Sequence, residues 1–223
     1  MSWAGTMFEY LMPALLVRQY ESSLLDQSNR AAVNLQIDYC RKKNVPWGVS
    51  ESGYYRFDVN LNYQYRAFGV PGLGFKRGLS EDLVVSPYAC LLALPVSPRK
   101  VAHNTEHLVN LKMLGLYGFY EAVDYTPSRL ILGRERSIVQ SYMSHHQSMI
   151  LLSLANYFFD DIMIRRFHAD PGIQSVELLL QEQIPVRVPL EELPTEEAAA
   201  PLVVHPPTTA TPWQIPVQSP FPQ

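Results

Sequence analysis

The segment SLLDQSNRAAVNLQIDY, residues 23–39, decides the fold class that we expect for this chain. Ser23 followed three residues later by Asp26 resembles a capping box, which marks the N-terminus of a helix. The apolar side chains that follow recur at helical spacing on one face: Leu25, Ala32, Leu35 and Tyr39. The segment therefore predicts an amphipathic helix of several turns.

Five more segments have the same helical period. They are a short helix between residues 6 and 20, an apolar one over 87–94, one from Ser97-Pro98 to Gly115, one whose face runs from Val139 to Tyr157, and a last one that starts at Asp170-Pro171. Long loops rich in aromatic residues separate them. Helices that alternate with long loops predict an all-α fold of stacked helix pairs, as in an α/α toroid.

The composition of the chain changes near Pro185. Ten of the eighteen prolines lie between this residue and the C-terminus, where they would break any helix. Few apolar residues in this part recur with any period. We therefore expect a folded domain over residues 1–187 and an extended, proline-rich linker or tail over residues 188–223.

Charge and cysteine content exclude several classes of protein. The net charge of −3 does not indicate the excess of positive charge that binding to nucleic acid requires. Cys40 and Cys90 are far apart and form no disulfide framework. No segment approaches the roughly 18 uninterrupted apolar residues of a membrane-spanning helix. We expect a soluble chain with no nucleic-acid partner and no direct insertion into a membrane.

Two acidic loops rich in aromatic residues are candidates for the chemistry: PWGVSES (46–52) and YGFYEAVDYTP (117–127). Cleavage or transfer of a glycosidic bond typically needs two carboxyl groups, together with aromatic surfaces for the sugar rings. Glu51 follows a Trp-Gly pair and lies between two serines that could orient it. Glu121 lies among aromatic side chains that would desolvate it and raise its pKa. These two glutamates are therefore our candidate catalytic residues.

Each candidate also has a simpler interpretation. A glutamate in a loop is usually only solvated, and composition alone favours that interpretation for Glu51 and Glu121. Glu9 lies in the otherwise apolar run GTMFEYLM, so it is either buried and paired or part of a site. These two possibilities stay open.

The segment SHHQS (144–148) suggests a metal site, but its spacing argues against one. Adjacent histidines on a helix point about 100° apart, and the i, i+4 pair that would bind one ion is absent. We expect His146 to line a polar cavity or to make a hydrogen bond in the core. The glycines of 69–74 match no phosphate-binding or dinucleotide-binding motif and more simply make turns. We therefore expect neither a metal nor a cofactor.

Several long motifs, in one order, resemble a known family. They are WAGTMFEYLMP (3–13), VPWGVSES (45–52), NYQYRAFGVPGLGFKRGL (62–79), DLVVSPYA (82–89), YGFYEAVDYTPSRL (117–130), YMSHHQSM (142–149) and RRFHADP (165–171). The chain is similar in these motifs to the glycoamylase-like domain of bacterial cyclic β-1,2-glucan synthases. The resemblance covers residues 2 to 187, and the proline-rich tail resembles that family's linker to its next module.

The resemblance implies a fold, a substrate and a pair of catalytic residues. The family's domain is an (α/α)6 barrel that closes linear β-1,2-glucan into a ring by transglycosylation, within a large protein of the bacterial inner membrane. Its acidic positions match Glu51 and Glu121, with Glu51 as nucleophile and Glu121 as general acid/base, or the reverse. From the loops and the resemblance together, we expect the glucan to contact Glu9, Trp47, Tyr63, Gln64, Tyr65, Arg66, Tyr117, Phe119, Tyr120, Asp124, Tyr125, His145, His146 and Gln147.

The number of predicted helices is too small for a complete barrel of this family. An (α/α)6 barrel needs about twelve helices, and six are expected here. We therefore expect the C-terminal half of a barrel, whose partners are the N-terminal half and the other modules of the parent synthase on the cytoplasmic side of the membrane. Three alternatives stay open. The chain could be a non-catalytic glycan-binding module, an endo-β-1,2-glucanase-type hydrolase or an inactive fragment.

Overall fold

The computed structural model describes residues 1–183, so the predicted linker over 188–223 lies outside the described residues. The longest helix is α2 (Leu24–Lys42), which confirms the helix expected from the opening segment. The Ser23 hydroxyl accepts a hydrogen bond from the Asp26 amide and caps this helix. The buried face is shifted by about one residue from the prediction, because it includes polar Asn29 and Gln36 besides Ala32 and Cys40.

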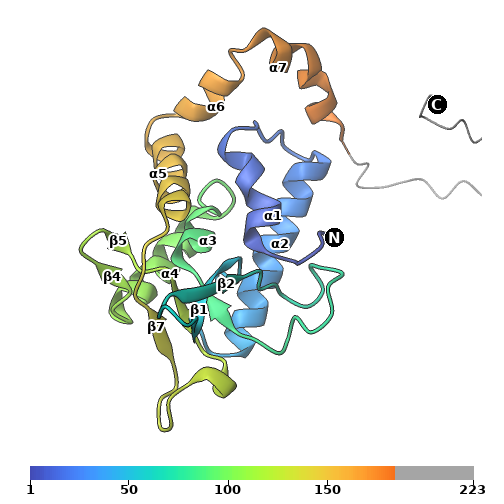
Figure 1. Ribbon diagram of the computed structural model, residues 1–223. Helices are drawn as coiled ribbons and strands as arrows, with labels where there is room; N and C mark the ends of the chain where they lie inside the picture. The colour runs from blue at the N-terminus through green and yellow to red at the C-terminus, as the bar shows by residue number, and fades with distance from the viewer. Residues whose placement is uncertain (184–223) are drawn as a thin grey trace, which may run out of the picture. The chain divides into compact units, whose positions relative to one another are not determined.

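Shorter helices flank α2. Along the chain they are α1 (Met7–Leu11), the 3-10 helix η1 (Met12–Leu15), α3 (Pro87–Leu91), α4 (Pro98–Asn110), η2 (Pro127–Arg129), α5 (Ser144–Phe158), α6 (Ile162–Phe167), α7 (Pro171–Val176) and η3 (Glu177–Gln181). Helices α1 and α2 lie side by side, and α5 leads into α6 and α7 at one end of the described domain (Figure 1).

Some helices differ from the sequence-based prediction. Helix α4 ends at Asn110 rather than at Gly115, because the chain turns at Lys112, which has a left-handed φ of 66°. Helix α5 begins at Ser144, since Val139 belongs to a strand. Helix α6 was not predicted, and its N-cap Asp161 is left-handed at φ 56°. Each difference arises at a local backbone turn that hydrophobic periodicity does not detect.

The expectation of an all-α fold holds only in part, because the described residues contain seven short strands besides these helices. Strands β1 (Ser52–Phe57) and β2 (Tyr63–Arg66) form an antiparallel hairpin. Strands β3 (Val84–Val85), β6 (Ala122–Asp124) and β7 (Ser137–Val139) form a sheet in that order. Strands β4 (Leu114–Gly115) and β5 (Gly118–Phe119) make a second small hairpin. The six residues of β1 do not alternate, since the first three are all buried, and most of the other strands are only two or three residues long, too short to show an alternating pattern.

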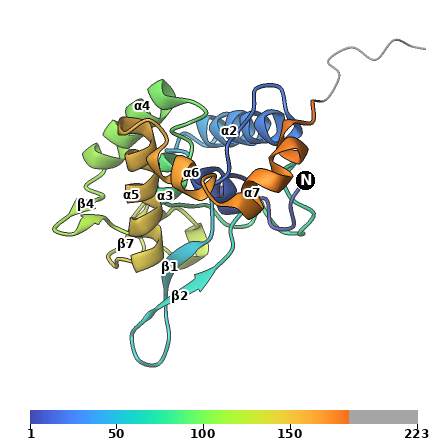
Figure 2. The same ribbon diagram turned by 90° about the horizontal axis from the view of Figure 1, so that it is seen from above.

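One hydrophobic core connects the helices to the strands. It includes Met7 and Leu11 of α1, Val33 of α2 and Val85 of β3, all of which are fully buried. The β1–β2 hairpin extends away from the helices when the domain is seen from above (Figure 2). The core therefore holds the first residues of β1, which follow Glu51, against the rigid helices.

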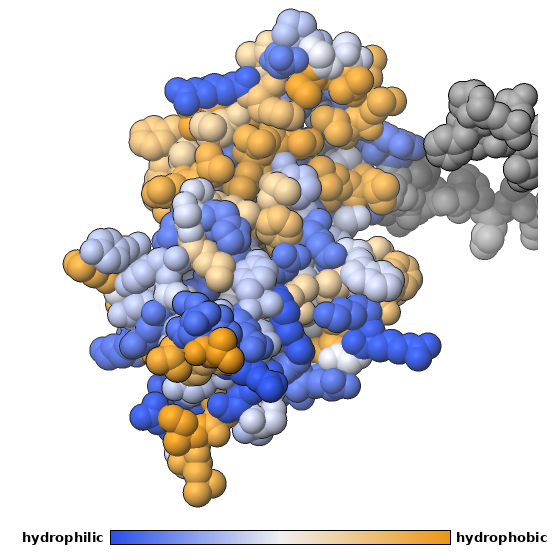
Figure 3. Space-filling view, viewed as in Figure 1, coloured by the Kyte–Doolittle hydropathy of each residue, from blue (hydrophilic) through white to orange (hydrophobic). Residues whose placement is uncertain are grey.

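Apolar side chains gather on the exposed surface over α5, α6 and α7 (Figure 3). Phe158 and Phe159 are 69% and 67% exposed, and Leu178 and Leu179 of η3 are 79% and 76% exposed. Large exposed apolar patches commonly mark interaction surfaces. None of the helices in the part of the chain that the structure describes is long and apolar enough to cross a membrane.

Candidate active site

The loop that carries Glu51 is held by buried hydrogen bonds from three helices. Gln36 of α2 bonds both backbone groups of Val49, at 2.8 and 2.9 Å. The Ser50 hydroxyl accepts from the Phe8 amide of α1 at 3.0 Å and from the Tyr88 hydroxyl of α3 at 2.8 Å. Tyr88 also lies 2.9 Å from the Glu51 carbonyl. The backbone at Glu51 is therefore fixed on both sides.

A glycine makes this loop geometry possible. Gly48 has a φ of +126°, and a Cβ atom there would lie 2.9 Å from the carbonyl oxygen of Ser86. Its own carbonyl accepts from the Ser86 amide at 2.9 Å. Only glycine accommodates both this dihedral angle and this close approach without strain. The glycine of the Trp-Gly pair is therefore required by the backbone conformation of this loop.

Glu51 is partly buried, and its surroundings favour the protonated carboxyl. Burial raises its pKa, and the negative charge of Glu9 adds to this effect, while His146 and a hydrogen bond from Tyr65 oppose it. Burial and the charges of Glu51 and Glu121 also raise the pKa of Tyr65, which keeps its hydroxyl protonated. A carboxyl with a raised pKa can retain a proton closer to neutral pH.

Glu121 has a different environment, because its side chain is only 1% exposed. One carboxyl oxygen accepts from the Gly53 amide at 3.0 Å, and the other lies 2.9 Å from Nδ1 of His146. The Ser86 hydroxyl donates to the Glu121 carbonyl. Both carboxyl oxygens are thus engaged within the protein, and they connect β1 to α5.

Glu9 forms a complete capping box with Thr6 at the start of α1. Its carboxylate accepts from the amides of Ala4 and Thr6 and from the Ser2 hydroxyl. Burial alone would raise its pKa, but these hydrogen bonds outweigh burial and lower it. Glu9 is therefore paired within the protein, although it is only partly buried. The negative charge of Glu9 nevertheless raises the pKa of Glu51.

Two histidines and a tyrosine complete the surroundings of Glu51. The ring centroid of Tyr65 lies 6.3 Å from that of His145 and 6.1 Å from that of His146. His146 stacks on Tyr88 at 3.7 Å, and its Nε2 atom is buried with no hydrogen-bond partner among the described residues. Burial lowers the pKa of His145, and the neighbouring His146 lowers it further. Within residues 1–183, no three acidic, histidine or cysteine side chains lie together in a group that could hold a metal ion.

Several other predicted contact residues have structural partners. Gln64 accepts from the Tyr54 hydroxyl at 2.6 Å. Arg66 pairs with Asp82 and lies over the ring of Phe68. Asp124 is fully buried and accepts hydrogen bonds from the Tyr55 amide and from the Arg129 guanidinium. Burial raises the pKa of Tyr125 to about 12. These residues hold the hairpin and the sheet in place.

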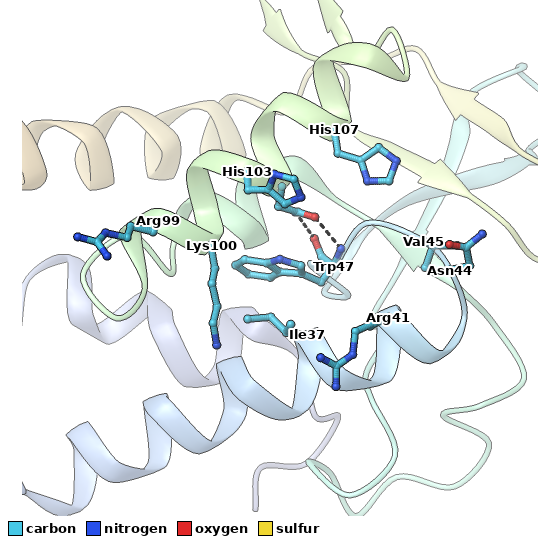
Figure 4. A pocket seen from close by; sticks show the side chains of 10 residues that line it. Ile37, Arg41, Asn44, Val45, Trp47, Arg99, Lys100, His103 and His107 are labelled. Carbon is cyan, nitrogen blue, oxygen red and sulfur yellow. Dashed lines mark hydrogen bonds between the residues drawn. The ribbon is translucent and has the colours of Figure 1, made fainter.

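The remaining predicted residues lie in three places. Tyr63 packs against Phe57, with ring centroids 4.7 Å apart, on the β1–β2 hairpin. Tyr117 and Tyr120 both contact the ring of Tyr142. Gln147 donates to the carbonyl of Phe119, a neighbour of these tyrosines. Trp47 lies apart from these groups, in a pocket between α2 and α4 (Figure 4).

Sequence reasoning missed three residues that organise the site: Gln36, Ser86 and Tyr88. Ser86 and Tyr88 lie in VVSPYACLL, an apolar run that indicates only a core helix. Gln36 lies on a helix face where a polar residue is normally solvated. A polar residue inside an apolar stripe was the one signal that could have identified them.

Comparisons with known proteins agree with the resemblance in sequence. Residues 1–171 match the family Glycoamylase, described as putative glucoamylase. The chain is 42% identical over 189 residues to the cyclic beta-(1,2)-glucan synthase NdvB of Rhizobium meliloti (strain 1021). That match covers 85% of this chain and 7% of the synthase.

Three solved structures have a similar fold. They are a putative glucoamylase from Bacteroides caccae ATCC 43185 (TM-score 0.57, 21% identity, 80% of this chain and 41% of that chain), an endo-β-1,2-glucanase from Chitinophaga pinensis (0.57, 21%, 81% and 42%) and a β-1,2-glucanase from Parabacteroides distasonis (0.54, 18%, 79% and 24%). The chain thus spans less than half of each of these proteins. At these identities the structural similarity shows the fold alone.

Proposed function

The chain belongs to the putative glucoamylase family, and on this premise we propose that it acts on β-1,2-glucan as part of a domain that closes the glucan into a ring. The identity to a cyclic β-1,2-glucan synthase supports this substrate, as do the β-1,2-glucanases of similar fold. The short match to each relative supports the partial (α/α)6 toroid expected from the sequence. The other modules of such a synthase are then its partners.

The observation that carries the proposal is the environment of Glu51. This carboxyl lies on an anchored loop, is partly open to solvent and has a raised pKa. These are the properties of a general acid that protonates the leaving oxygen of a glycosidic bond and then, as a carboxylate, accepts a proton from the attacking hydroxyl. We therefore assign the acid/base role to Glu51, the reverse of our first assignment from sequence.

Glu121 suits a positioning role better than a catalytic one. A nucleophile must reach the anomeric carbon, whereas both oxygens of Glu121 are buried and hydrogen-bonded. Its bond to the Gly53 amide instead fixes the strand two residues after Glu51. Glu9, the other carboxylate that acts on Glu51, is occupied by the capping box. We propose that the second catalytic carboxylate belongs to a part of the domain outside this 223-residue chain.

Aromatic and imidazole groups beside Glu51 are suited to bind the sugar. The exposed ring of Tyr65 offers an apolar face to a pyranose. The exposed imidazole of His145, 6.3 Å from the Tyr65 ring, can exchange hydrogen bonds with a sugar hydroxyl, whereas His146 is buried behind it on Glu121. The cluster of Tyr117, Tyr120 and Tyr142 provides a second aromatic surface.

Two measurements test this proposal against the alternatives. Calorimetric titration of the 223-residue chain with linear β-1,2-glucan should give saturable binding that Tyr65→Ala weakens. The chain alone should not turn the glucan over, because it holds one of the two carboxylates. No binding at millimolar glucan would reject β-1,2-glucan as the ligand, and turnover by the chain alone would reject an external second carboxylate.

Ring closure itself needs the rest of the domain. In a chimaeric Rhizobium synthase, the part of this chain that matches the synthase over 189 residues replaces the matching segment. Cyclic products would support transglycosylation, and shorter linear products would identify a hydrolase. Linear glucan that is bound but unchanged in length would support the non-catalytic alternative.

A further inference from the structure

A second pocket lies between α2 and α4, separate from the surroundings of Glu51. It has a volume of about 500 Å³. Trp47 lies between the two helices, beside Ile37 and Lys100, with Arg41 and His103 nearby (Figure 4). A volume of this size is typical of a site for a small molecule.

The floor of the pocket is apolar and rigid. Trp47 is only 6% exposed, and Asn104 of α4 bonds both of its backbone groups, at 3.1 and 2.8 Å. Ile37 and Val45 complete the apolar lining from the α2 side. A flat and fixed apolar surface of this kind suits a ring.

The rim of the pocket is basic. Five of its lining residues carry arginine, lysine or histidine side chains, and none of them carries a carboxylate. Arg41 is paired with Asp38 at 2.9 Å, but its side chain remains 74% exposed. The ammonium of Lys100 contacts only the neutral amide oxygen of Asn34 among the described residues. The chain as a whole carries a net charge of −3, so this concentration of positive charge is local.

We infer that this pocket binds a small organic phosphate, with its ring on the apolar floor and its phosphate at the basic rim. Arginine and lysine are the usual partners of phosphate, and several cations around one space favour a dianion over a monoanion. The inference does not rest on the proposed glucan chemistry, since neither Glu51 nor Tyr65 nor His146 lines this pocket.

Calorimetric titration of the 223-residue chain with glucose 6-phosphate tests the inference. Arg41→Gln/Lys100→Gln removes two exposed charges from the rim. Lys42→Gln/Lys43→Gln is the matched control, because it removes two charges from the same end of α2 and neither residue lines the pocket. We expect saturable binding that the rim variant weakens about tenfold or more, and that the control changes less than about twofold.

Additional titrations identify whether the pocket recognises the phosphate or the sugar of glucose 6-phosphate. Inorganic phosphate should compete with glucose 6-phosphate, glucose should not bind at the pocket, and Glu51→Gln should leave the affinity unchanged. Absence of saturation by glucose 6-phosphate would overturn the inference. Equal weakening by the two double variants would also overturn it, as would competition by glucose that matches that of phosphate.

Discussion

The Nδ1 atom of His146 lies 2.9 Å from Oε2 of Glu121, and the two side chains are only 2% and 1% exposed. The ring of His146 also stacks on the ring of Tyr88. The Tyr88 hydroxyl is hydrogen-bonded to the Ser50 hydroxyl and lies 2.9 Å from the Glu51 carbonyl. The buried pair therefore connects α5 to β1 through the Gly53 amide, and the stacking on Tyr88 connects it to α3.

Replacing Glu121 by alanine should destabilise the fold. The change leaves the Gly53 amide and the His146 ring without their partner in a buried place. We expect a loss of about 1–3 kcal/mol in the free energy of unfolding, measured by urea denaturation. Glu106→Ala, at an exposed position on α4, is the control. A loss no larger than that of the control would show that the pair does not support the fold.

Replacing Gln36 should destabilise the loop that carries Glu51. Gln36→Leu keeps the size of the side chain but removes both hydrogen bonds to Val49. The Val49 amide is then buried without its partner, and the Val49 carbonyl keeps only the bond from the Met7 amide, which should cost about 1–3 kcal/mol in unfolding free energy. Binding of β-1,2-glucan should weaken as well, because the loop before Glu51 is no longer fixed. Lys42→Leu, exposed on the same helix, should change neither quantity.

The pKa of Glu51 predicts how stability depends on pH. Burial and the charge of Glu9 raise this pKa in the folded state. Such a group contributes fully below the pKa of the unfolded chain, and its contribution is lost as the pH rises through the folded pKa. Glu51→Gln cannot ionise, so it should gain stability relative to the native chain as the pH rises from about 4. Melting temperatures of both proteins between pH 4 and pH 7 check this, and a constant difference would contradict it.

The apolar surface over α5 to η3 predicts self-association of the purified chain. Leu178 and Leu179 are among its most exposed residues. Leu178→Ser/Leu179→Ser should therefore lower the average mass measured by light scattering. Leu116→Ser/Leu132→Ser removes two leucines that are 85% and 102% exposed elsewhere. An equal effect of this control pair would show that the α5–η3 surface has no special role.

The sequence was informative where a pattern extends over several turns or where a motif is long. Helix α2, with its Ser23 cap, was predictable because its period persists and its capping residue is specific. The two acidic loops were identifiable because carboxylates rarely occur among so many aromatic residues. The short strands were not predictable, because two or three residues cannot show a period. Their pairing depends on residues distant in sequence, such as Val84 and Asp124.

The different roles of Glu51 and Glu121 also could not be predicted from the sequence. Both are glutamates in aromatic loops, and only tertiary contacts distinguish the open carboxyl from the buried one. Likewise, nothing local indicates that the side chain of Trp47 lies between α2 and α4, with the backbone of the same residue bonded to Asn104.

The central claim is that Glu51 supplies the proton in glycosyl transfer. It is tested most directly by Glu51→Gln in the chimaeric synthase, with Glu106→Gln as the control and with linear and cyclic β-1,2-glucan quantified by mass spectrometry. The account predicts that cyclic product falls by about 100-fold or more, the usual contribution of general acid/base catalysis, while linear glucan still forms. Ring closure by Glu51→Gln at the rate of the control would contradict the account.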